Sequence, residues 1–333
     1  LFSSGTTGFH KKVQLTGALR DRRLQSQIRR RAYGPQTRHF IGSLGPWTVH
    51  GYLGPLSIWA QGGAIIFHQI ADVISAIAAT KPNRLFATPG LAEDWMRQMG
   101  KSRIDASAMR ISVGGGPMSP SLWVAMQEAF RGGQFFQVYG TTECGGISDT
   151  QIRSETDLGR FELNGETELQ VTDPDGNPMP AGAMGAVRVR SDLMVKQYLD
   201  DPAASAVFFR DGWFYPGDMG VIGHDGRLTL TGRFAEVINM RGDKIAPGMV
   251  EEPIKNALNA REVAVLSRPS PGKFDELHVF IVEGAPLNRE RIEQALKPLA
   301  HAFSKIGVHK SDGLPRTTTG KVQYGQLRAS IKT

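Results

Sequence analysis

The sequence has little of several features that would narrow its class at once. Cys144 is the single cysteine among 333 residues. A lone cysteine excludes an internal disulfide and any metal site built from several cysteines, and it fits a reducing, cytoplasmic location. No apolar run approaches the roughly 20 residues that span a bilayer, since Pro55 and Gly62 interrupt the longest candidate. We therefore expect no membrane span.

The composition is that of an ordinary globular chain with an excess of positive charge. Hydrophobic residues make up 40% and charged residues 21%, and the length suggests about two domains. The net charge of +7 raises the question of a nucleic-acid partner, because six arginines fall between Arg20 and Arg31. No aromatic residues interleave with these arginines, which disfavours single-strand binding.

The arginine-rich segment also has the pattern of a helix. Leucine and isoleucine recur at near-helical spacing from Leu15 to Ile28, Thr16 is a suitable N-cap, and Gly34 with Pro35 ends the run. We expect a solvated helix whose basic face can attract a phosphorylated ligand, and we consider nucleic-acid binding the less favoured alternative.

The pattern of polar and apolar residues changes twice along the chain. In residues 1–150 the apolar runs at 64–67, 84–88, 110–115 and 135–140 are typical of buried strands, with a helix expected at 119–130. Residues 151–234 alternate polar and apolar side chains around Asp-Gly turns, which indicates antiparallel hairpins. After 235 we expect helices near 249–260 and 288–299 around a strand pair. The sequence thus predicts an α/β domain with a parallel sheet and an antiparallel β part, then a smaller α+β C-terminal domain.

A loop at the start of the chain is suited to phosphate. In "SSGTTGFHKK", residues 3–12, glycines let the backbone amides turn inward, hydroxyls donate, and Lys11 adds charge. The segment does not fit the P-loop pattern. By itself such a run is more often a solvated linker, so both interpretations stay open at this point.

Two further loops follow expected strands, where α/β sheets bind ligands. In "VGGGPMS", 113–119, the glycines let a flat ring lie against bare backbone. In "VYGTTECGG", 138–146, Tyr139 can stack on a ring, Thr142 can donate to a phosphate, and Glu143 can hold Mg²⁺. Each loop alone is equally explained as a tight turn.

Together these motifs resemble the adenylate-forming superfamily of acyl-CoA synthetases, nonribosomal-peptide adenylation domains and luciferases. "SSGTTGFHKK" is similar to its phosphate loop, "YGTTE" to its adenine and magnesium motif, and "GWFYPGDMG" to its ribose motif. "GRFAEVINMRGDKIAPGMVEE" resembles its hinge and thiol-tunnel segment, and "LPRTTTGKVQYGQLR" its C-terminal lysine motif. In that family a long segment precedes the phosphate loop, so we expect an N-terminally incomplete copy.

The resemblance implies ATP-dependent activation of a carboxylic acid to an acyl adenylate, then transfer to a thiol. It implies a large domain over 1–234 and a mobile C-terminal domain over 235–333. Lys321, Thr142 and Glu143 would be catalytic, Glu143 holding Mg²⁺. The residues assigned to ATP or AMP are Ser4, Gly5, Thr6, Thr7, Gly8, Lys11, Gly115, Gly116, Pro117, Tyr139, Gly140, Thr141, Asp218 and Arg233. His50, Gly145 and Gly242 would line the acid pocket or the thiol tunnel.

The lack of an acidic residue after the phosphate loop narrows the class of acid that the protein would activate. Amino-acid-activating relatives carry an aspartate after the phosphate loop, whereas residues 40–70 contain no acidic side chain. A buried ammonium group without a partner is costly, so a plain carboxylic acid is favoured. The small residues of "ECGG" and "GGGP" leave space near the reactive centre, which fits an aryl or medium-chain acid. We expect an acid:CoA ligase that uses ATP, Mg²⁺ and coenzyme A. The alternatives are an enzyme that loads carrier-protein phosphopantetheine and a non-catalytic or nucleic-acid-binding protein.

Overall fold

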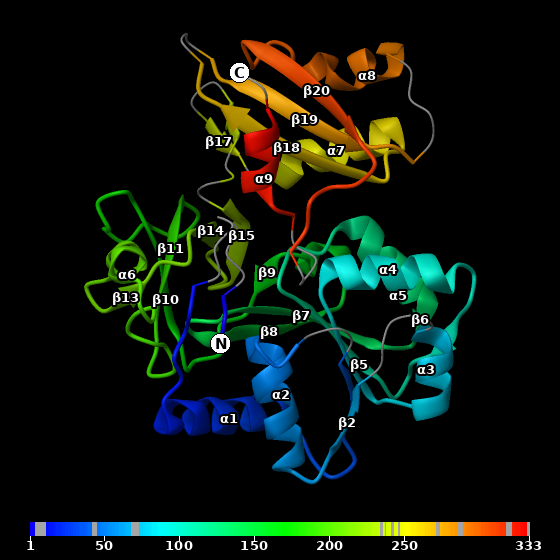
Figure 1. The fold of residues 1–333 in the computed structure, drawn as a ribbon, viewed down its shortest axis with the longest axis vertical. Helices are drawn as coiled ribbons and strands as arrows, with labels where there is room; N and C mark the ends of the chain where they lie inside the picture. The colour runs from blue at the N-terminus through cyan, green and yellow to red at the C-terminus, as the bar shows by residue number, and fades with distance from the viewer. Residues whose placement is uncertain are drawn as a thin grey trace.

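A computed structural model of the chain describes residues 1–3, 11–41, 45–67, 73–233, 236, 238–240, 243–245, 247–270, 274–284, 289–317 and 322–331. The elements form an α/β layer, an antiparallel sheet and a smaller α+β part (Figure 1). The fold class expected from the sequence is therefore confirmed. None of the helices in these ranges has the length and apolar character that crossing a bilayer requires.

The α/β layer is built on a mixed sheet. Its strands, in spatial order, are β2 (Ala64–Phe67), β1 (Arg38–Ile41), β3 (Arg84–Ala87), β5 (Arg110–Gly114), β7 (Gln134–Thr141) and β8 (Gly145–Ile152). The first five pair in parallel, and β8 returns antiparallel to β7. The parallel arrangement places the loops after β5 and β7 at the same edge of the sheet.

One strand departs from expectation. Residues 64–67 form a strand, but β2 is at the edge of the sheet and Phe67 is 60% exposed. The prediction of a buried strand is wrong there, because apolar composition alone does not distinguish an edge strand from a central one.

Helices cover both faces of this sheet (Figure 1). They are α1 (Gly17–Arg31), α2 (Val49–Trp59), α3 (Val73–Thr80), α4 (Pro89–Met99) and α5 (Pro120–Ala129). The N-caps Thr16, Thr48, Thr88 and Ser119 each accept a backbone N–H, which satisfies a donor that the first helical turn leaves free. The expected cap at Thr16 is confirmed, and α1 ends at Ala32 in the left-handed region, φ 46°, before Gly34.

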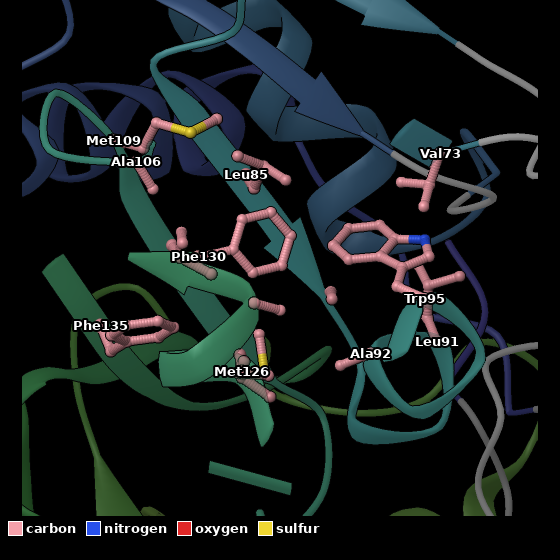
Figure 2. Packing of buried hydrophobic residues seen from close by; sticks show 14 of the residues in the cluster. Val73, Leu85, Leu91, Ala92, Trp95, Ala106, Met109, Met126, Phe130 and Phe135 are labelled. Carbon is pink, nitrogen blue, oxygen red and sulfur yellow. The ribbon is translucent and has the colours of Figure 1, made fainter. Parts of the chain in front are cut away.

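A dry core fixes the sheet against α3, α4 and α5 (Figure 2). Trp95 of α4 is fully buried and packs edge-on against Phe40 of β1, with ring centroids 5.9 Å apart. Leu85 faces this core, whereas its neighbour Phe86 points to the opposite face, where it stacks on His50 of α2. The strand alternation therefore separates a structural face from the face that borders the candidate site.

The antiparallel sheet has the order β12-β13-β11-β14-β15-β9, with β10 beside β11. Its strands are β9 (Arg160–Phe161), β10 (Glu168–Thr172), β11 (Met184–Arg190), β12 (Phe209–Arg210), β13 (Trp213–Phe214), β14 (Asp218–Ile222) and β15 (Leu228–Arg233). The 3₁₀ turn Glu155–Asp157 and α6 (Pro202–Phe208) join them. Gly176 and Gly226 have positive φ in the connections of β10–β11 and β14–β15, which confirms the Asp-Gly hairpins.

The C-terminal elements have a core of their own. They are β16 (Ile238–Met240), β17 (Asp243–Ile245), α7 (Pro247–Leu258), β18 (Glu262–Arg268), β19 (Glu276–Val282), α8 (Arg289–Leu296), the 3₁₀ turn Lys297–Leu299, β20 (Lys305–Ser311) and α9 (Tyr324–Ser330). The two expected helices and the strand pair are confirmed. The sequence prediction missed β20, which pairs parallel to β19, and α9. Two short strands elsewhere, β4 (Ile104–Asp105) and β6 (Phe130–Arg131), pair with each other.

Candidate active site

A cavity of about 500 Å³ lies where β5 and β7 end, beside α1 and α2. Two of its walls are polar. The loop wall is the segment 140–146, which comprises the end of β7, the turn and the start of β8. The helix wall is the face of α1 formed by Arg23, Ser26, Gln27, Arg30 and Arg31.

Backbone packing shapes the loop wall. A side chain on Gly140 would meet the Gly145 carbonyl oxygen at 2.5 Å, and the β7–β8 register shifts at this point. The Thr141 hydroxyl accepts the Cys144 N–H at 3.0 Å and closes the turn. The loop therefore presents Thr142 and Glu143 to the cavity, as the motif predicted. Burial raises the pKa of the Cys144 thiol to about 12, so this cysteine is not a nucleophile.

Glu143 is held on one side and open on the other. Its Oε1 accepts the Tyr198 hydroxyl at 2.8 Å, and its carbonyl accepts the Val195 N–H at 2.9 Å. Its Oε2 makes no hydrogen bond within the described ranges, although the residue lines the cavity. One carboxylate oxygen is thus available to a cation such as Mg²⁺. The described residues contain no cluster of three metal-binding side chains.

Asp218 and Arg233, which the family resemblance assigned to the nucleotide site, form an ion pair. They are opposite each other on β14 and β15, with Arg233 Nε 3.3 Å from Asp218 Oδ1. The Tyr139 hydroxyl donates to the second oxygen, Oδ2, at 2.7 Å. Arg233 lines the cavity together with Pro216, whereas Asp218 is buried and outside the lining.

Tyr139 requires a correction. Its ring is 7% exposed, packs against Phe161 and belongs to the core rather than to the cavity lining. The stacking position expected for it is therefore not the one observed. Burial and then the neighbouring Asp218 raise the pKa of its hydroxyl well above the usual value, so the group stays a hydrogen-bond donor.

The glycine loop after β5 contributes less than expected. Gly115 lines the cavity together with Gly114, whereas Gly116 and Pro117 are exposed and outside the lining. A side chain on Gly114 would press on the Val138 carbonyl at 3.0 Å, which explains a glycine there. Gly114 could not be distinguished from its neighbours by sequence, because three glycines in a row leave the contact position ambiguous.

Lys11 and the residues around it form another part of the lining. The Lys11 ammonium lies 4.7 Å from the Phe208 ring centroid and 5.6 Å from that of Tyr198. The remaining phosphate-loop residues, Ser4 to Gly8, lie outside the described residues, as do Gly242 and Lys321. Thr317, four residues before Lys321, lines the cavity.

His50, Trp47 and Gly145 also line the cavity. The His50 ring stacks on Phe86 at 3.7 Å between centroids, and its Nε2 is 3.4 Å from Nε2 of His39. Burial, and then the Arg31 charge, lower the pKa of His50 well below the usual value. The imidazole therefore stays neutral at physiological pH and cannot act as a cation toward an anion.

The arginine helix is the largest error of the sequence analysis. Arg23 is 3% exposed and donates to the carbonyl oxygens of Leu193 (2.7 Å), Thr142 (3.0 Å) and Glu143 (2.5 Å). Burial lowers its pKa to about 10. The expectation of a solvated helix is wrong for this face, because its arginines find partners far away in the sequence.

Comparison with known proteins places this fold and site in one class. The model of the family described as AMP-binding enzyme matches residues 1–199. The chain belongs to this family, which confirms the resemblance to adenylate-forming enzymes.

Relatives extend the match. The chain is 24% identical over 356 residues to 4-coumarate–CoA ligase 2 of Nicotiana tabacum, covering 99% of this chain and 64% of the relative. It is 29% identical over 285 residues to indoleacetate–CoA ligase of Aromatoleum aromaticum, covering 82% and 55%. The chain thus spans about half to two thirds of these relatives.

Solved structures share the fold. ATP-bound MatB from Rhodopseudomonas palustris superposes with a TM-score of 0.86 at 22% identity, covering 99% of this chain and 67% of that one. The O-succinylbenzoate coenzyme A synthetase of Bacillus subtilis, in complex with ATP and magnesium, gives 0.83 at 23% identity, covering 98% and 69%.

Proposed function

We propose that the protein activates a carboxylic acid with ATP to give an acyl adenylate and then transfers the acyl group to coenzyme A. One observation carries this proposal: Glu143, Lys11 and Arg233 line a single cavity that is also lined by Leu53 and Phe86. The polar groups suit a nucleoside triphosphate, and the apolar ones suit the body of an organic acid. The names of the relatives point the same way, since they are CoA ligases of aryl acids.

In the first step a carboxylate attacks the α-phosphate, and pyrophosphate leaves. Both reactants are anions, so donors and cations must be aimed where charge accumulates. We assign Ser4 to Gly8 and Lys11 to the leaving phosphates, and Lys321 to the gap between carboxylate and α-phosphate. Mg²⁺ held by Glu143 would neutralise phosphate charge. Thr142 would donate to a phosphate oxygen.

We assign the ribose of the nucleotide to the residues Asp218 and Arg233 on strands β14 and β15. Asp218 accepts two hydroxyl hydrogen bonds readily and would bind the ribose, with Arg233 fixing its orientation. Gly115 and Thr141 would border the base, because both line the cavity that Arg233 also lines. Tyr139 would act through Asp218 rather than by stacking.

The second step needs a different arrangement of the C-terminal elements. We infer that residues 235–333 form a domain with two orientations, one presenting Lys321 and the other presenting Gly242 to the thiol. The tunnel beside Gly242 must admit a thin thiol arm, which coenzyme A and carrier-protein phosphopantetheine share. Coenzyme A is favoured because the relatives named above are CoA ligases. The single buried cysteine fits a reducing, cytoplasmic setting.

The full chain tests the proposal by ATP–pyrophosphate exchange with a panel of carboxylic acids, followed by thioester formation with coenzyme A. We expect exchange that depends on both the acid and Mg²⁺, and thioester formation with free coenzyme A. Exchange without thioester would favour carrier-protein loading. Absence of exchange with every acid would contradict the proposed reaction.

A further inference from the structure

The helix wall brings more positive charge to the cavity than the proposed reaction at the loop wall uses. Arg23, Arg30 and Arg31 all line it, and Ser26 and Gln27 add polar groups between them. These residues recur on one face of α1, so a regular helix delivers three guanidinium groups to one part of the pocket. An aryl or aliphatic acid with a single carboxylate brings no second anion into the cavity to face them.

The nearby carboxylates do not balance this charge. Arg31 and Arg110 share Asp149, at 3.2 and 2.6 Å, while Arg29 and Arg30 share Glu166. Arg23 bonds only to carbonyl oxygens among the described residues. With the Glu143 carboxylate near Arg23, five guanidinium groups therefore face three carboxylates, and of these only Glu143 lines the cavity. Partly buried cations in such excess are costly unless a bound anion compensates them.

Arg30 is placed to receive that anion. Its Nε donates to the Ser26 hydroxyl at 3.2 Å and lies 3.6 Å from Glu166, so the stem is fixed from behind. Its two terminal nitrogens make no hydrogen bond within the described ranges, and the side chain is 17% exposed. A planar guanidinium with both terminal nitrogens available suits a bidentate carboxylate.

The loop wall makes room for this group. A side chain on Gly146 would meet Arg30 Nη2 at 2.8 Å, so the guanidinium lies directly against the bare backbone. Gly146 is three residues after Glu143, which limits the distance between their Cα atoms to about 11 Å. A compact substrate can therefore extend from the reacting centre to Arg30.

Resting on the proposed function, we propose that the acid substrate is a dicarboxylic acid. One carboxylate is activated beside Glu143, and the other binds the terminal nitrogens of Arg30. Arg31 Nε lies 3.2 Å from Asp149 and its Nη1 donates to the Tyr33 hydroxyl, so Arg31 contributes charge rather than the main contact. Arg23 holds the loop wall in place behind the site.

The test uses matched acids in the exchange assay on the full chain: glutarate against pentanoate, and isophthalate against meta-toluate. We expect the wild-type kcat/KM to favour at least one diacid over its partner by roughly 10- to 100-fold, the worth of a hydrogen-bonded charge. Arg30→Gln should remove that preference, so that the kcat/KM values for the diacid and its monoacid partner become equal. Arg29→Gln is the matched control, because Arg29 pairs with the same Glu166 but is outside the cavity lining.

Gly146→Ala is a second variant that keeps the charge and displaces the guanidinium, and it should also lower diacid use selectively. Faster exchange with monoacids in the wild type, or equal effects of the Arg29 and Arg30 changes, would overturn the inference while the proposed function stands. If no acid supports exchange, calorimetry with isophthalate alone decides. Binding that Arg30→Gln abolishes and Arg29→Gln keeps supports the site, and no binding overturns it.

Discussion

The loop wall and the helix wall border one cavity, but their chemistry has different origins. The loop wall depends on its own backbone, because Gly140 leaves no space for a side chain and Glu143 follows within three residues. The helix wall depends on long side chains that leave a regular helix, and Arg23 ends on carbonyls of the loop wall itself. A local motif thus sets the first wall, and tertiary contacts set the second.

The largest effect should come from the loop wall. Glu143→Gln keeps the shape but removes the charge that would hold Mg²⁺, so we expect adenylation to slow by roughly 10²- to 10³-fold, as for one lost transition-state contact. Single-turnover formation of acyl adenylate measures this step. Tyr198→Phe is the control, since it removes the hydroxyl on Oε1 and keeps the carboxylate. A loss in Glu143→Gln no greater than in this control would remove Glu143 from the metal site.

These two walls also show how far the sequence could predict the molecule. The βαβ pattern, the cap at Thr16, the helix at 119–130 and the Glu143 loop could be predicted, because short-range sequence determines strand, cap and turn chemistry. The burial of Arg23 could not be predicted, because the apolar residues and the buried arginines of α1 recur at the same helical spacing. The arginine-bearing face of α1 is buried because Arg23 donates to the carbonyls of residues 142, 143 and 193, which are distant in the sequence.

The contact between Arg23 of the helix wall and the loop wall can be tested by measuring the free energy of unfolding. Arg23→Met keeps most of the side-chain length but removes a donor from three carbonyls, of which only that of Glu143 keeps another donor, the Val195 N–H. We therefore expect the free energy of unfolding to fall by about 3 kcal/mol. Denaturant titration measures the loss. Arg22→Met on the exposed side of α1 is the matched control and should change little. Equal losses in both variants would mean that Arg23 does not tie the two walls together.

The hydroxyl of Tyr139 tests the corrected assignment. Tyr139→Phe keeps the ring and removes the donor to Asp218, so we expect the KM for ATP to rise about 10-fold with little change in kcat. Initial rates at saturating acid measure both constants. An unchanged KM would favour the stacking role instead, because phenylalanine stacks as well as tyrosine.

The smallest expected effect is a pH dependence of stability caused by His39, which is buried near Arg31 of the helix wall. Burial, then the charges of Arg31 and Arg84, lower the pKa of His39 to about 3, against an ordinary value of 6.5. Between these values the unfolded chain binds a proton that the folded chain does not, so acidification below pH 6.5 destabilises the fold. From pH 7 to 5.5 this one histidine should cost about 1 kcal/mol. Denaturant titrations at the two pH values should therefore show a smaller loss in His39→Gln than in the wild type, and an identical loss would mean that His39 takes up its proton in the folded state.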